Sequence, residues 1–162
     1  MASAPVVELL DLPAEYGRAE VALTWEAVRA RLVAARHFWL VTVRPDGRPH
    51  VVPVDGIWLV DACFFGGSAR TVKHRNLTHD PRAALHLEDA ASAVIVEGAC
   101  EWLFPDAAVA DGLARASREK YGYAPEPASY SSSGVWCLRP ARVLSWQQFP
   151  RDATRFVFPS RP

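Results

Sequence analysis

The sequence predicts a single domain, residues 1–162, of mainly antiparallel β-strands that close or nearly close into a barrel flanked by helices. Short runs rich in β-branched and aromatic residues alternate with Gly, Pro and Asp turns, which predicts six to seven strands. Helical periodicity is confined to three segments. The chain has 162 residues and is 50% hydrophobic, enough for a globular core. Together these features favour an α+β fold.

The N-terminal part of the chain is predicted to contain one helix. Residues 1–20 show no period and are expected to form an irregular arm. Apolar residues then recur at helical spacing over Trp25–Arg36, and Thr24 is a suitable N-cap.

Three strands are predicted next. Phe38–Val43 and Pro49–Trp58 flank an Asp46-Gly47 pair, which is a strong hairpin signal. A second turn separates them from the apolar run Ala62–Phe65. We therefore expect a three-stranded meander.

The middle of the chain begins with a glycine break. Gly66-Gly67 ends the meander, and Arg70–His79 is predicted to be a short helix that stops before Pro81. Two further strands are predicted, Ala83–Glu88 and Ala93–Phe104.

The last third is predicted to hold a helix from the cap at Asp106 to Tyr121, with Gly122 as its C-terminal stop. The Pro- and Ser-rich segment Tyr123–Gly134 is expected to be a surface loop, and surface roles are favoured for Tyr121 and Tyr123 over lining a substrate opening. Two strands broken at Pro140 complete the sheet: Val135–Leu138 and Arg142–Phe149.

Composition excludes several classes of protein. Eighteen basic and eighteen acidic residues give zero net charge, which disfavours nucleic acid as a partner. No apolar run approaches the ~20 residues of a membrane helix, and no signal peptide is evident, so we expect a cytoplasmic protein without a membrane partner. The three cysteines lack ligand-like spacing and are expected to be reduced core residues, so no metal site is predicted.

The stretch Gly66–Leu77 carries the clearest chemical pattern. Free N–H groups at a helix N-terminus attract anions, and glycines allow a ligand to approach the backbone. Ser68 and Thr71 can donate hydrogen bonds to phosphate oxygens. Arg70 and Lys73 add positive charge that opposes the helix dipole unless an anion is bound. The pattern indicates a phosphate site; a solvated helix face is the alternative.

Several segments also match a known family in order and spacing. They are Val41–Val54, Ser68–Leu77, Asp80–Arg82, Val96–Ala99, Pro140–Trp146 and Asp152–Phe156. Over residues 25–158 the chain resembles the pyridoxamine 5′-phosphate oxidase-like split-barrel family. The last segment is similar to a tail of its flavin- or deazaflavin-dependent members.

The resemblance implies a six-stranded split barrel that forms a homodimer and binds FMN or the deazaflavin coenzyme F420 between the protomers. The strand whose backbone faces the cofactor ring comprises His50, Val51, Val52, Pro53 and Val54. The residues implied to hold the phosphate are Ser68, Arg70, Thr71 and Lys73. By analogy, Trp146 and Arg155 approach the cofactor from the partner subunit.

We therefore expect an oxidoreductase that transfers a hydride between the cofactor and a small planar unsaturated substrate. F420 is favoured over FMN by the tail and by a scarcity of lysine, which is typical of GC-rich coding. The alternatives are an FMN-binding oxidoreductase and a non-catalytic protein that binds flavin, F420 or haem. The C-terminal Trp and Arg-Leu-x-Pro ending of pyridoxamine 5′-phosphate oxidase itself is missing, which disfavours that activity. No side chain is identified as a catalytic acid.

Overall fold

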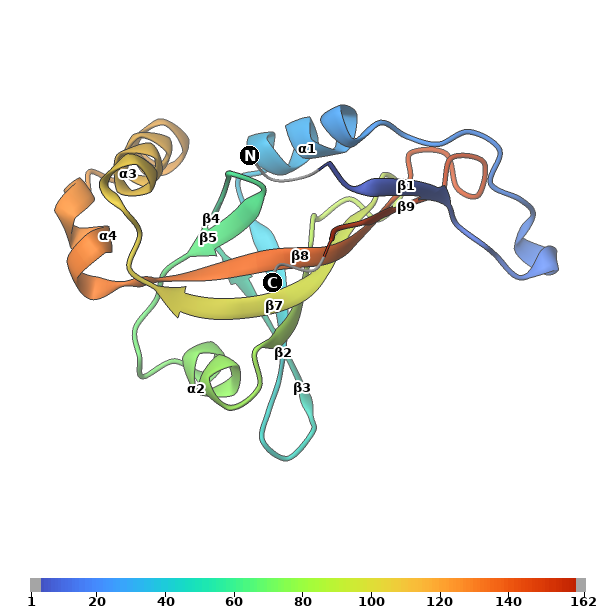
Figure 1. Ribbon diagram of the computed structural model, residues 1–162. Coiled ribbons are helices and arrows are strands. Elements are labelled where there is room, and N and C mark those ends of the chain that lie inside the picture. The colour runs from blue at the N-terminus through green and yellow to red at the C-terminus, as the bar shows by residue number, and fades with distance from the viewer. Residues whose placement is uncertain (1–3, 160–162) are drawn as a thin grey trace.

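The computed structural model describes residues 4–159 and contains one antiparallel sheet flanked by helices (Figure 1). Its elements are β1 (Val6–Leu9), a 3₁₀ helix (Ala14–Tyr16), α1 (Trp25–Ala34), β2 (Phe38–Val43), β3 (Pro49–Val54), β4 (Gly56–Leu59), β5 (Ala62–Phe65), α2 (Val72–His79), β6 (Arg82–His86), β7 (Val94–Leu103), α3 (Ala107–Tyr121), α4 (Pro127–Ser133), β8 (Val135–Ser145) and β9 (Thr154–Val157). The predicted α+β class is confirmed.

Seven of the strands form the barrel. Hydrogen-bonded neighbours follow the order β3-β2-β6-β7-β8, and the first half of β8 also pairs with β5, which pairs with β4. No pairing joins β3 to β4 among the described residues, so only the chain at Asp55 links the two ends of the path. The barrel is therefore split at this point.

The strand count exceeds the six to seven expected because two short strands extend the sheet. β9 pairs with the second half of β8, and β1 pairs with β9. The described part of the arm, expected to be irregular, thus contains a strand and the 3₁₀ helix. Their partners lie near the other end of the chain, where local sequence gives no signal.

β8 differs most from its prediction, because one continuous strand replaces two strands broken at Pro140. A bulge absorbs the proline: Glu97 pairs with Arg142 while Gly98 pairs with Pro140, so Ala141 has no partner in the register. A Cβ at Gly98 would clash with the carbonyl oxygen of Arg139, so only glycine fits this close approach.

Other boundaries shift for local reasons. The predicted strand Pro49–Trp58 divides into β3 and β4 at Asp55, whose carboxylate bonds to other side chains. The helix predicted over Arg70–His79 begins at Val72, because Thr71 is its N-cap. The segment predicted as a loop contains α4, which begins at Pro127.

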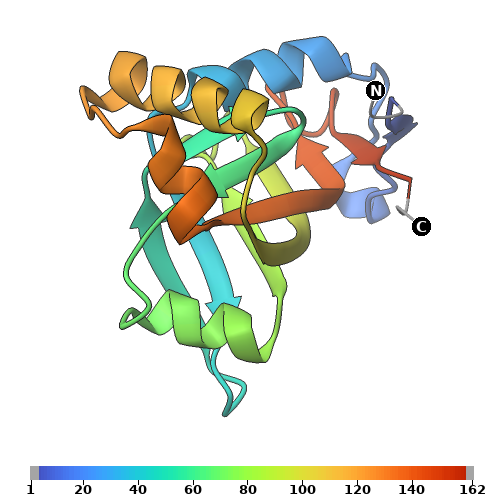
Figure 2. The ribbon, with the colours of Figure 1, turned by 60° about the vertical axis from the view of Figure 1, so that its left-hand side comes forward.

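Two apolar clusters lie on opposite sides of β5 and β8. Cys63 and Phe65 of β5 point into the barrel core, while Ala62 and Phe64 pack toward Leu113 of α3. All four residues of β5 are buried, as expected for a strand covered on both faces. α3 therefore lies over the outer face of β4, β5 and β8, as Figure 2 shows.

The predicted helix caps are confirmed. The Thr24 side chain accepts a hydrogen bond from the backbone N–H of Ala27, and Asp106 accepts one from Val109. Gly122 ends α3 with a left-handed φ of 74°.

The three cysteines are buried, and burial raises the pKa of the Cys63 and Cys100 thiols. Within residues 4–159 no three His, Cys, Asp or Glu side chains group as metal ligands. No helix in the same range is long and apolar enough to span a bilayer.

The turn between β4 and β5 is strained at Val60. Val60 and Asp61 have φ values of 45° and 55°, the pattern of a two-residue type I′ hairpin. A β-branched residue is disfavoured there, whereas asparagine tolerates it. We expect Val60→Asn to raise the free energy of unfolding by about 1 kcal/mol, which thermal denaturation would detect as a rise in Tm of about 3 °C.

Val7→Asn in strand β1 is the matched control and should not stabilise the protein, because the regular strand disfavours asparagine. An equal rise in Tm for both variants would rule out backbone strain as the cause.

Candidate functional site

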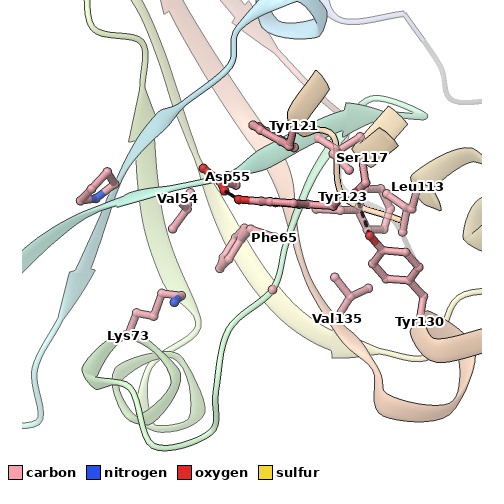
Figure 3. A pocket seen from close by; sticks show the side chains of 14 residues that line it. Val54, Asp55, Phe65, Lys73, Leu113, Ser117, Tyr121, Tyr123, Tyr130 and Val135 are labelled. Atoms are coloured by element: carbon pink, nitrogen blue, oxygen red, sulfur yellow. Dashed lines mark hydrogen bonds between the residues drawn. The ribbon is translucent and has the colours of Figure 1, made fainter. Parts of the chain in front are cut away.

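A cavity of about 420 Å³ lies where the barrel is split. Its walls come from the ends of β3 and β5, from β4 and the start of β8, and from α2, α3 and α4. Figure 3 shows Lys73 at one end, the Ser117–Tyr130 pair at the other, and Asp55 and Tyr123 between them. The volume is in the range typical of small-molecule sites.

The cationic end of the cavity is built by the turn between β5 and α2. Gly67 has a φ of 141°, a backbone conformation that residues with a side chain rarely adopt, so glycine is favoured there. Lys73 makes no hydrogen bond or ion pair with any other residue in the described range. Burial lowers the pKa of its ammonium. This half-buried cation has room for an anion beside it.

The other residues predicted to hold the phosphate have different positions. The Thr71 hydroxyl caps α2: it donates to the carbonyl oxygen of Ser68 and accepts from the N–H of His74. The Ser68 side chain accepts from the N–H of Arg70, and its own hydrogen has no acceptor within the described residues. The Arg70 guanidinium is exposed and likewise unpaired there. Of these four residues Lys73 alone lines the cavity; Ser68 and Arg70 keep donors free outside its lining, and Thr71 orders the turn.

β3 is the free edge at the split. The N–H of Arg44 donates to the carbonyl oxygen of Arg48 at 2.9 Å, which fixes the alternation of hydrogen bonds in the β2–β3 ladder. By this alternation the N–H and C=O of Val51, and the C=O groups of Pro49 and Pro53, point away from β2. Prolines at these positions cost no ladder bonds.

The predicted strand residues therefore divide between two faces and one edge. Val52 and Val54 pack toward the barrel core, whereas Val51 and Pro53 are exposed. Pro53 and Val54 line the cavity, and His50, Val51 and Val52 do not.

His50 belongs to a polar network inside the barrel. The Asn76 amide of α2 donates to the Thr42 hydroxyl of β2 at 2.9 Å, and Thr42 Oγ1 lies 3.4 Å from Nδ1 of His50. Asn76 and Thr42 are buried. Burial, followed by the positive charges of Arg44 and Lys73, lowers the pKa of His50. The network ties α2 to the strand at the free edge.

The opposite end of the cavity is formed by α3 and α4. Leu113, Ser117 and Tyr121 follow one another at four-residue spacing and face the cavity. The Ser117 and Tyr130 hydroxyls lie 2.9 Å apart. We call Leu113, Ser117, Tyr130 and Val135 the distal end of the cavity.

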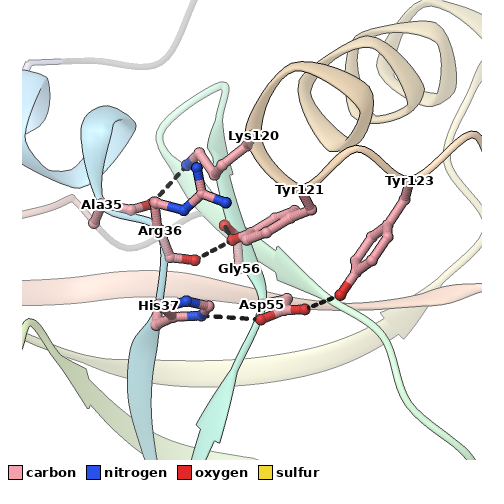
Figure 4. Close-up of polar contacts among 8 residues, drawn as sticks. All are labelled: Ala35, Arg36, His37, Asp55, Gly56, Lys120, Tyr121 and Tyr123. Atoms are coloured by element: carbon pink, nitrogen blue, oxygen red, sulfur yellow. Dashed lines mark hydrogen bonds and ion pairs between the residues drawn. The ribbon is translucent and has the colours of Figure 1, made fainter.

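A polar cluster forms the rim between the two ends (Figure 4). Asp55 accepts from the Tyr123 hydroxyl at 2.5 Å and lies 3.0 Å from Nδ1 of His37. The Tyr121 hydroxyl lies within hydrogen-bond distance of the carbonyl oxygens of Gly56 and Arg36 and shares its one hydrogen between them. Burial raises the pKa of Tyr121, and the hydrogen bond to Asp55 raises that of Tyr123. Both phenols thus remain neutral.

Trp146 and Arg155 do not line this cavity. The Trp146 indole donates to the carbonyl oxygen of Ala90, and Arg155 forms an ion pair with Glu8 at 2.6 Å. Arg155 instead borders an open groove of about 990 Å³ on the outer face of the sheet. The floor of this sheet groove includes Val41, Val43, Ala84, Ala99, Ala141 and Val157.

The sequence profile described as pyridoxamine 5′-phosphate oxidase matches residues 24–147. The chain belongs to this family. The match covers the barrel, the turn between β5 and α2, and both helices of the distal end, so the resemblance seen in the sequence is confirmed. No curated protein sequence matches the chain.

Solved structures with a similar fold carry different descriptions. A conserved hypothetical protein from Mycobacterium tuberculosis gives a TM-score of 0.65 at 22% identity over 80% of this chain and 88% of its own. An F420 reductase gives a TM-score of 0.55 at 26% identity, over 76% of this chain and 98% of its own. A heme binding protein from Mycobacterium smegmatis gives a TM-score of 0.57 at 28% identity, over 82% of this chain and 59% of its own. This chain thus spans little more than half of that last protein.

Sequence reasoning missed the distal end and the rim of this oxidase-family site. Tyr121 and Tyr123 were expected at the surface; Tyr123 is exposed and Tyr121 is half-buried, and both line the cavity. The four-residue spacing of Leu113, Ser117 and Tyr121 was available as a signal. The pairing of Asp55 with Tyr123, 68 residues apart, had no local signal.

The Asn76–Thr42 hydrogen bond gives a test of how α2 is held. Asn76→Leu should lower the free energy of unfolding by about 1–3 kcal/mol, because it leaves the buried Thr42 hydroxyl without its donor. Thr42→Val combined with Asn76→Leu should cost less than the sum of the two single changes, since the buried amide and the hydroxyl that accepts from it are then removed together. Urea denaturation of the four proteins measures this coupling; strictly additive losses would argue against it.

Proposed function

We propose that this protein is an oxidoreductase that binds coenzyme F420, with FMN as the alternative cofactor, and reduces a small planar unsaturated molecule. The proposal treats residues 1–162 as one cofactor-binding domain that works in the cytoplasm as a homodimer. The observation that carries it is Lys73, a half-buried cation without a partner in the described chain, at one end of an aromatic cavity in an oxidase-family barrel.

The residues at the cationic end fit a phosphate ester. Lys73 supplies a point charge, the exposed Arg70 supplies a guanidinium, and Ser68 keeps a free hydroxyl hydrogen. Gly66 leaves the backbone of the turn open, since nothing lies within 4 Å of the position a Cβ would take. We propose Ser68, Arg70 and Lys73 as the direct phosphate ligands and Thr71 as the residue that orders the turn.

The free edge of β3 fits the ring of such a cofactor. Val51 presents an N–H donor and a C=O acceptor that have no partner within residues 4–159, and the prolines on either side keep another strand from extending the sheet. The proposed ring-facing residues are His50, Val51, Val52, Pro53 and Val54. A bound flavin or deazaflavin supplies hydride-transfer chemistry, and the chain orients its ring and restricts water around it.

F420 is preferred to FMN on two grounds: the likeness to a solved F420 reductase and the tail that resembles deazaflavin-dependent members. The haem alternative is less well supported. None of the 14 residues that line the cavity is His, Cys or Met. The hydroxyls of its three tyrosines, which could otherwise ligate iron, already make hydrogen bonds.

The sheet groove fits a second copy of this chain. Its floor carries small apolar side chains that allow close approach. Two ion pairs, Glu8–Arg155 and Glu97–Arg142, border it and supply both positive and negative charge. Such a surface can pair with itself across a twofold axis. We propose that Arg155, which borders the groove, approaches the partner subunit's cofactor from this side, and that Trp146 also approaches that cofactor.

The cofactor proposal predicts a loss of affinity when both cations are removed. Lys73→Ala combined with Arg70→Ala should weaken F420 or FMN binding by more than about 1 kcal/mol, because charge-assisted hydrogen bonds to the phosphate are lost. Absorbance identifies the cofactor that copurifies or binds, and fluorescence titration gives its Kd.

Arg48→Ala is the matched control, because Arg48 is exposed at the β2–β3 turn and pairs only with Asp46. It should leave the Kd unchanged. Unchanged affinity in the double variant would place the phosphate elsewhere. Stopped-flow absorbance then monitors reoxidation of the reduced cofactor by a broad panel of acceptors. If no acceptor reoxidises it, a non-catalytic binder is favoured over an enzyme.

The dimer proposal predicts dissociation when the groove is blocked. Ala99→Arg should convert a dimer to a monomer at micromolar concentration, because a bulky charge would occupy the interface. Light scattering measures the mass. Ala108→Arg on the exposed face of α3 is the control and should remain dimeric; a monomeric native protein would refute the proposal outright.

A further inference from the structure

The distal end of the cavity has no charged side chain. The residues that line the cavity include one cation, Lys73, at the opposite end, and one carboxylate, Asp55, at the rim. Leu113 and Val135 are buried apolar residues, and Ser117 is only 4% exposed. A charged group placed here would lose its hydration and meet no counter-ion.

The Ser117–Tyr130 pair keeps one hydrogen to donate. Two hydroxyls 2.9 Å apart share a single hydrogen bond, in which one donates and the other accepts. Neither hydroxyl makes another hydrogen bond within the described range. The hydroxyl that accepts therefore has its own hydrogen available to a carbonyl oxygen of a ligand.

The walls that lead to this pair suit a flat molecule. The rings of Tyr121 and Tyr123 are stacked, with centroids 5.4 Å apart and planes inclined by 24°. Phe64 and Phe65 add aromatic surface from β5. Aromatic side chains of this kind favour planar ligands by stacking.

The carboxylate of Asp55 makes the cavity still less favourable for an anionic ligand. Its carboxylate lies at the rim, where it is held by Tyr123 and His37, and it repels an anion near the distal end. The exposed guanidinium of Arg36 lies outside the lining, with its carbon 6.0 Å from the centre of the Tyr121 ring. Arg36 thus acts on the rim at Tyr121, and no cation is among the residues that line the distal end.

We propose that the distal end of this cavity admits an uncharged planar carbonyl compound, whose oxygen accepts a hydrogen bond from the Ser117–Tyr130 pair, and rejects carboxylates and phosphate esters. The inference rests on the proposed function, in which Lys73 is occupied by the cofactor phosphate. It narrows the substrate class of that site and excludes acidic substrates.

Chromone and chromone-2-carboxylate form a matched pair of probes, because they differ by one carboxylate on the same planar enone. Isothermal titration of the full-length protein, with and without its cofactor, gives both affinities. The native chain with its cofactor bound should prefer chromone by at least about tenfold. Equal or tighter binding of the carboxylate to this loaded protein would overturn the proposal.

Two conservative variants test the hydroxyl pair. Of Tyr130→Phe and Ser117→Ala, the variant that removes the hydroxyl donating to the ligand should weaken chromone binding by about three- to tenfold, because a neutral hydrogen bond is lost. Tyr16→Phe is the control: Tyr16 is exposed and packs against Phe149, outside the cavity lining, so the affinity should not change. Circular dichroism confirms that each variant is folded, and unchanged affinity in both folded cavity variants would overturn the proposal.

Lys73→Ala separates this inference from the proposed function. The variant should lose cofactor affinity but keep its affinity for chromone, because Lys73 lies at the other end of the cavity. Loss of chromone binding by apo Lys73→Ala would contradict a distal site. A native protein that binds chromone through Tyr130 but binds neither F420 nor FMN would refute the proposed function and support the distal site.

Discussion

The burial of β5 on both faces is the constraint on which the site depends. Cys63 and Phe65 anchor the strand in the barrel core, and Phe64 anchors it beneath α3. A shift of one residue in its register would exchange these sets and leave neither cluster packed. Because β5 runs directly into the Gly66–Lys73 turn, the same packing fixes the cationic end of the cavity relative to the helices that form its distal end.

Much of the fold could be predicted because its signals are local. The Asp-Gly hairpin, the caps at Thr24 and Asp106 and the stop at Gly122 each depend on residues within a few positions of one another. The errors arose where distant contacts override local preference. Pro140 is accommodated within β8 only because Gly98 of β7 lets the backbones approach, and β1 forms only because β9 pairs with it.

The candidate site also has one part that local sequence predicts and another that depends on distant contacts. Its cationic turn follows from residues 66–73, whose glycines, hydroxyls and cations are adjacent in sequence. The rim joins His37 of one segment, Asp55 of a second and Tyr123 of a third, so its formation depends on the tertiary fold. Ser117 is a polar residue that faces the cavity from α3, and periodicity alone treats such a residue as solvent-exposed.

The contacts of Lys120 constrain how a ligand can enter. Its ammonium donates to the carbonyl oxygens of Val33 and Ala35 at 2.8 Å each, and so satisfies the C-terminal end of α1 from α3. An outward movement of α3 would break both of these hydrogen bonds, so it would be an unfavourable way to open the cavity to a ligand. Rotation of the exposed Tyr123 side chain breaks one hydrogen bond at the surface. Ligand exchange is therefore expected to follow fast side-chain rotation and to leave the helices in place.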